Sequence, residues 1–155
     1  MKFGRLSKMI ENAKALSLEG AFRYTLSDKS ITDYIIQLNT DEQLFEGVDS
    51  QGRQVGTYSE YTEKLNQGRS FGGKAKIAGQ PWFFYDTGDF FNSFYIKAEK
   101  DSFVIIATDA DKMQDLFGDL ESVDILIGLT PESRELLIVE ILPKIREYVL
   151  KKLLS

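Results

Sequence analysis

Glycine is concentrated in the middle of this chain and divides it into parts of different character. Residues 47–80 hold seven of the twelve glycines: Gly47, Gly52, Gly56, Gly68, Gly72, Gly73 and Gly79. Glycine inside a helix or strand is destabilising, because it loses more backbone entropy on folding than any other residue. We therefore expect a loop region at about 47–80, with regular helices and strands on either side of it.

This loop region is also basic. Between residues 51 and 80 there are two acidic side chains, Glu60 and Glu63, and five basic ones: Arg53, Lys64, Arg69, Lys74 and Lys76. One short helix is expected inside the loop, from Ser59 to Gln67, with Gly68 at its end. The loop could contact phosphates or become ordered on assembly, but Gly72-Gly73-Lys74 lacks the spacing of a known phosphate-binding loop.

Apolar residues at three- and four-residue spacing predict two helices before the loop region. The first covers residues 5–18, with Gly20 at its end, and its apolar face is Leu6, Met9, Ile10, Ala13 and Leu16. The second runs from Ile31 to about Glu46, with Ser30 as its N-cap and Gly47 after its end. Polar residues in the middle of the second pattern leave open a division into two short helices.

The strands are expected between residues 80 and 108, the most aromatic part of the chain. One strand is predicted at Trp82–Tyr85. Apolar and polar residues then alternate over 94–99, and an apolar run follows at 103–107. The polar pair Lys100-Asp101 between these two runs predicts a β-hairpin, and we expect most of the aromatic side chains to lie in the core.

A long helix is predicted at the end of the chain. Thr130 is expected to be its N-cap and Pro131 its first residue, and its buried stripe is predicted to be Leu137, Ile138, Ile141, Ile145 and Tyr148. Pro143 lies inside this helix and is expected to kink it, because proline has no N–H to donate. A short helix or turn is also expected from Asp111 to about Leu120.

These patterns predict an α+β fold, with a small antiparallel β-sheet at about 80–108 packed against N-terminal helices and a long kinked C-terminal helix. The 155 residues are enough for one domain, so we expect residues 1–155 to form a single domain. No signal peptide is recognised and no run approaches about 18 apolar residues. We therefore expect no membrane partner and a cytoplasmic site of synthesis.

The absence of cysteine and histidine restricts the possible chemistry. It excludes disulfides, thiol nucleophiles, Cys/His zinc sites and catalytic dyads that use histidine. The net charge of −5 argues against a dedicated nucleic-acid binder. Residues 109–124 hold a further acidic cluster, but Met113, Gln114 and Leu120 stand where a calcium loop needs its ligands and its glycine. We interpret the cluster as a solvated acidic surface.

Asp86-Thr87-Gly88 matches the catalytic triplet of aspartic proteases, in which two carboxylates share a proton and activate water. With one copy per chain, such an enzyme would be a homodimer of the retroviral type, and Ile125–Gly128 is similar to a segment near the last helix of those proteases. However, the bulky Asp89-Phe90-Phe91 follows the triplet where that family has small residues. The homodimeric protease is therefore our alternative hypothesis, and a plain binding module is a third.

The wider surroundings of the triplet resemble a different family. Residues 82–94 have the form apolar-x-x-Thr-Gly-x-apolar-x-x-Ser-apolar, carried by Thr87, Gly88, Phe90, Ser93 and Phe94. This is similar to the Thr-Gly-x-Leu-x-x-Ser-Ile signature of bacteriophage virion-morphogenesis proteins, the tail-completion and head–tail joining group. Phe90 and Phe94 replace the usual Leu and Ile. The segments 44–52 and 58–64, and the hairpin ending at 105–109, also resemble that group in the same order.

The resemblance implies a structural virion protein of a tailed phage or prophage, with copies forming a ring at the neck or tail that joins or completes head and tail. It implies neighbouring neck, portal or tail proteins as partners, and location in the virion after assembly in the bacterial cytoplasm. It implies no enzyme activity, no catalytic residue and no bound cofactor or metal. The basic residues 53–76 and the acidic residues 109–124 are then candidate surfaces for contacts between copies.

Overall fold

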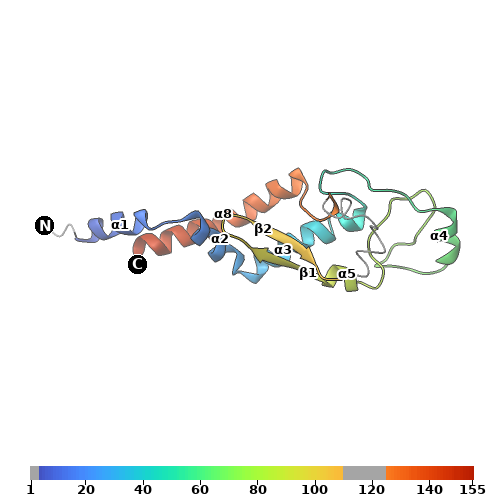
Figure 1. The fold of residues 1–155 in the computed structure, drawn as a ribbon, viewed down its shortest axis with the longest axis horizontal. Coiled ribbons are helices and arrows are strands. Elements are labelled where there is room, and N and C mark those ends of the chain that lie inside the picture. Colours follow the sequence, from blue (N-terminus) through green and yellow to red (C-terminus); the bar gives the residue numbers. More distant parts are fainter. Residues whose placement is uncertain (1–3, 110–124) are drawn as a thin grey trace.

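In the computed structural model, which describes residues 4–109 and 125–155, the chain begins with three helices rather than two (Figure 1). They are α1 (Gly4–Lys14), α2 (Leu18–Leu26) and α3 (Lys29–Thr40). The first helix ends at Lys14, four residues earlier than predicted, and the prediction that Gly20 marks a helix end is wrong. Gly20 lies in the first turn of α2, where its N–H donates to Oγ of the N-cap Ser17 at 3.0 Å.

Position 20 of α2 holds a glycine because α8 passes close to it. A Cβ atom at this position would collide with the hydroxyl of Tyr148, so only glycine fits without movement. The predicted N-cap of the next helix is also wrong, since Asp28 caps α3 and accepts the Ser30 N–H at 3.0 Å. The division into two short helices is confirmed, because α3 is followed by the 3-10 helix η1 (Leu44–Glu46).

The loop region contains the predicted short helix, α4 (Glu60–Leu65), capped by Ser59. The predicted strand at Trp82–Tyr85 is wrong, because its backbone bonds go to different segments. The N–H of Trp82 donates to the carbonyl of Gly56 at 3.0 Å, and that of Phe84 donates to the carbonyl of Leu44 at 3.2 Å. The backbone of residues 82–85 therefore fastens the loop region to η1 and forms no ladder with a neighbouring strand.

The α+β class is confirmed, with a sheet smaller than the sequence suggested. After the short helix α5 (Asp89–Asn92), strands β1 (Phe94–Ala98) and β2 (Phe103–Ala107) pair as an antiparallel hairpin, with Ile96 opposite Ile105. The last helix, α8 (Pro131–Leu154), begins after the N-cap Thr130 as predicted. It continues through Pro143. The element expected at 111–120 lies outside the described residues.

Two buried clusters form the core. One contains Leu44, Leu126 and the aromatic residues Phe84, Phe90, Phe91 and Phe94. The other lies between α3 and α8 and contains Ile31, Ile35, Leu38, Leu129 and Leu137. The molecule is elongated, with α1 and the end of α8 at one extremity and the loop region with α4 at the other (Figure 1).

Candidate functional site

The Asp86-Thr87-Gly88 motif forms the turn that leads into α5. Gly88 is the N-cap of α5 with a φ of 95°, a conformation that favours glycine. The hydroxyl of Thr87 donates to Oδ2 of Asp89 at 2.6 Å. The ammonium of Lys76 lies 3.4 Å from Oδ1 of Asp86. These contacts explain the motif as the start of a helix and one side of an ion pair.

The aromatic residues that follow the motif lie in the core, as expected. The rings of Phe90 and Phe94 have centroids 5.1 Å apart in an edge-to-face arrangement, and both residues are buried. Ser93 satisfies the end of α5, because its hydroxyl donates to the carbonyl of Phe90 at 2.7 Å. The residues that carry the family resemblance therefore build the junction between α5 and β1.

Cations of the basic loop bind carboxylates of their own chain. Lys74 lies 2.7 Å from Oε1 of Glu46 and also donates to the carbonyl of Phe45 at 3.0 Å. Arg53 lies 2.8 Å from Oδ2 of the buried Asp49. Burial raises the pKa of Asp49, but hydrogen bonds from the Arg53 and Gln51 backbones and from the Arg53 side chain outweigh it, so the pKa is lowered overall.

The acidic surface predicted at 109–124 lies outside the described residues apart from Asp109. The segment just after it, 126–130, is fixed by two buried polar side chains that the sequence analysis did not single out. Gln43 donates to the carbonyl of Gly128 at 2.7 Å and accepts the N–H of Thr130 at 3.2 Å. Asn39 donates to the same carbonyl of Gly128 at 3.0 Å. Residues 126–130 therefore join the two core clusters.

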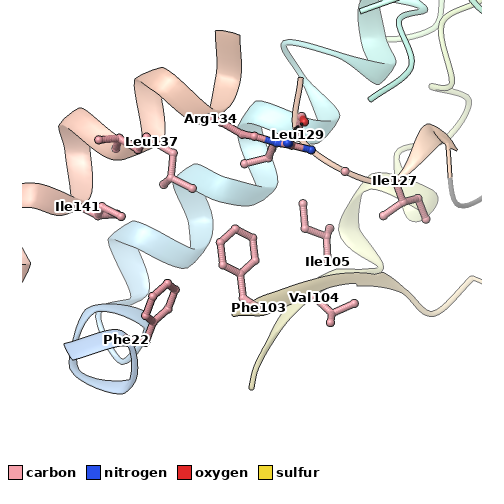
Figure 2. A pocket seen from close by; sticks show the side chains of 11 residues that line it. Phe22, Phe103, Val104, Ile105, Ile127, Leu129, Arg134, Leu137 and Ile141 are labelled. Carbon is pink, nitrogen blue, oxygen red and sulfur yellow. Dashed lines mark hydrogen bonds between the residues drawn. The ribbon is translucent and has the colours of Figure 1, made fainter. Parts of the chain in front are cut away.

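A mainly apolar groove of about 460 Å³ lies between α2, β2 and α8 (Figure 2). Segment 127–129 forms one wall, and Nε of Arg134 donates to the carbonyl of Leu129 at 3.0 Å. The other lining side chains are almost all hydrocarbon: Phe22, Phe103, Val104, Ile105, Leu137, Ile138 and Ile141. Such a groove can accept apolar side chains, and among the described residues that line it none is a nucleophile or a carboxylate.

Helix α8 exposes large apolar side chains both at the groove, where Ile138 lies, and on the side that faces away from the core. Leu137 and Tyr148 of the predicted stripe are buried, but Ile138 is exposed, so that part of the prediction is wrong. The large exposed apolar residues of α8 are Leu136, Ile138, Val139, Leu142, Leu150 and Leu154. A second apolar stripe in the sequence, at positions 136, 139, 143 and 150, is the signal that could have indicated this surface.

In residues 4–109 and 125–155, no group of three or more carboxylates could hold a metal ion. Within the same ranges, no helix is long and apolar enough to cross a membrane. Comparison with protein-family models, with curated proteins and with solved structures found no match.

Proposed function

We propose that this chain is a structural assembly protein whose copies form a ring at the neck or tail of a tailed phage or prophage particle. The observation that carries this proposal is the exposed apolar surface of α8, which includes Leu136, Val139 and Leu142. Fully burying a side chain of this size is worth about 1.5–3 kcal/mol. Large exposed apolar patches mark interaction surfaces.

The structural account of the Thr87-Gly88 segment supports the same proposal. Thr87, Gly88 and Ser93 each have a structural contact or backbone role, and none of them needs a reaction to explain it. The resemblance to virion-morphogenesis proteins is the reason for placing the chain in a phage particle, for a ring of copies, and for neck, portal or tail proteins as its neighbours. The elongated shape also suits a ring subunit, because each copy can present different surfaces to its two neighbours.

The proposal is tested in the particle itself. Antibodies against this chain should label purified virions at the neck or tail in electron micrographs, and genes for portal, capsid and tail proteins should neighbour its gene. As a control, the same antibodies should not label particles from a phage mutant that lacks the gene. Absence of the chain from purified virions would overturn the proposal.

A further inference from the structure

Helix α1 exposes two large apolar side chains, those of Leu6 and Ile10. None of its residues is buried, and Leu6 and Ile10 are 57% and 50% exposed. The helix is held to the end of α8 by Lys8, which donates to the carbonyl of Ser155 at 2.5 Å, and by Asn12, which donates to that of Leu153 at 3.5 Å.

These anchoring residues lie on the opposite side of α1 from Leu6 and Ile10, whereas Met9 lies nearer to Asn12 and is half-buried. Lys8 follows Leu6 by two residues, and Asn12 follows Ile10 by two residues, which corresponds to a rotation of about 200° on an α-helix. We call Leu6 and Ile10 the apolar side of α1, and this side faces away from α8 of its own chain. A helix of 11 residues is marginal by itself, and packing of its apolar face supplies most of a helix's stability in proteins.

The first half of α8 presents a surface of matching character. Val139 is 69% exposed and Leu142 is 55% exposed, and Leu136 lies beside them. We call these three residues, with Glu132, Glu135 and Glu140, the outer face of α8. Leu137, one residue after Leu136, is buried. The outer face is thus the side of the helix directed away from the core.

The two surfaces carry opposite charge. Lys8 lies opposite the apolar side of α1 and does not contribute to its charge. Lys14 lies beside the apolar side, and Arg5 and Glu11 flank it at equal rotations, so its surroundings carry +1. Residues 132–140 have three glutamates against the single Arg134, which gives −2. Complementary charges steer association and fix the alignment of two surfaces.

We propose that the apolar side of α1 in one copy packs on the outer face of α8 in the next copy. The inference rests on the proposed function, because a ring repeats one contact between two different surfaces. Within one chain the contact cannot form. Leu153, where α1 is anchored, lies 14 residues after Val139, which is about 21 Å along the helix.

Direct pairing of two α8 helices is the competing arrangement, and the charges oppose it. Arg146 follows Val139 by two helical turns and lies near the middle of the apolar stripe that runs from Leu136 to Leu154. An antiparallel pair centred on this stripe would set the two Arg146 side chains against each other. A parallel pair would instead align the three glutamates of the outer face with their own copies.

Because the chain has no cysteine, crosslinking between introduced cysteines tests the contact directly. Two singly substituted proteins, Ile10→Cys with an affinity tag and Val139→Cys without one, are mixed and treated with a short bismaleimide. The matched control replaces the second protein with Glu60→Cys, since α4 is exposed at the other extremity (Figure 1). We expect the Ile10–Val139 product to exceed the control product at least fivefold.

Equal yields for the two mixtures, or a larger product from Val139→Cys mixed with Leu150→Cys, would overturn the inference.

A second test reverses the charges of the two surfaces. Arg5→Glu with Lys14→Glu should lower the Ile10–Val139 product, and Glu135→Lys with Glu140→Lys in the other protein should restore it. If the wild type assembles without the α1–α8 product, this inference fails and the ring proposal stands. If the Ile10–Val139 product is found only in dimers, the ring proposal fails instead. A wild type that stays monomeric excludes both the ring and the α1–α8 contact.

Discussion

Lys144 and Asp28 form an ion pair in which Nζ lies 2.6 Å from Oδ2, and this pair joins α8 to the start of α3. The other carboxylate oxygen of Asp28 accepts the Ser30 N–H at 3.0 Å and the Ser30 hydroxyl at 2.7 Å. The hydrogen bond from Lys144, aided by those from Ser30, lowers the pKa of Asp28 from 3.8 to about 2. The Asp28 carboxylate therefore caps α3 and also binds α8 through Lys144.

This ion pair predicts a dependence of stability on pH. Because the pKa of Asp28 is lower in the folded protein, its contribution is fully present above about pH 4 and is lost as the pH falls towards 2. Lys144→Met removes the main cause of the shift. The difference in unfolding free energy between wild type and Lys144→Met should be largest at pH 5 and should shrink between pH 4 and pH 2.

Denaturant unfolding at a series of pH values provides the measurement. Lys100→Met, in the exposed turn of the hairpin, is the matched control and should follow the wild-type curve. A difference between wild type and Lys144→Met that stays constant from pH 5 to pH 2 would show that the ion pair does not cause the effect.

Gln43 should matter more for stability than a surface glutamine. Gln43→Leu leaves the Gly128 carbonyl without its shortest hydrogen bond and removes the acceptor of the Thr130 N–H. Leaving buried polar groups unsatisfied costs about 1–3 kcal/mol, so we expect a loss of that size in denaturant unfolding. Gln37→Leu, on the exposed side of α3, is the control and should change stability by less than about 0.5 kcal/mol. Equal effects of the two substitutions would contradict the role of Gln43.

The close approach of Tyr148 to Gly20 predicts a rescue experiment. Gly20→Ala should destabilise the protein by about 1–3 kcal/mol, because the new methyl group meets the tyrosine hydroxyl. Tyr148→Phe removes that hydroxyl, so the double variant should recover part of the loss in thermal unfolding. Gly4→Ala is the control, since no atom lies near that position. If Gly20→Ala is as stable as the wild type, the packing of α2 on α8 is looser than described.

Asp86 tests the protease hypothesis. We expect the wild type to have no pepstatin-sensitive peptidase activity at acidic pH, because Asp86 is paired with Lys76 in a turn that starts α5. Asp86→Asn should change only stability, by about 0–1 kcal/mol for a partly exposed ion pair. An inhibitor-sensitive cleavage that the variant abolishes would establish the enzyme instead.

Elements with strong local signals were predictable from the sequence. The Thr130-Pro131 start of α8, the presence of a short helix near residues 59–67, and the hairpin at 94–107 each depend on neighbouring residues alone. The role of Gly20 was predicted wrongly because the sequence alone does not distinguish a glycine that ends a helix from a glycine that lies against a packed side chain. Trp82–Tyr85 was misread because aromatic runs favour strands, whereas its backbone partners lie far away in the chain.

The candidate site was less predictable, because exposure depends on which side of a helix finds a partner. The sequence shows that α8 is apolar on more than one side, but only packing decides that Leu137 is buried and Ile138 exposed. The apolar stripe of α1 was recognised in full, yet the structure leaves it unburied. The basic loop was a candidate contact surface, and in the structure Lys74 and Lys76 bind Glu46 and Asp86 of the same chain.

Copies of this chain are proposed to assemble through α1 and α8 into a closed ring, and native mass spectrometry of the purified wild type distinguishes this ring from a monomer. We expect one discrete species larger than a dimer, at an integer multiple of the 17.6 kDa chain, and its loss in Val139→Glu with the thermal midpoint unchanged. A wild-type protein that remains at 17.6 kDa, alone and with its neck or tail neighbours, would show that no such ring forms.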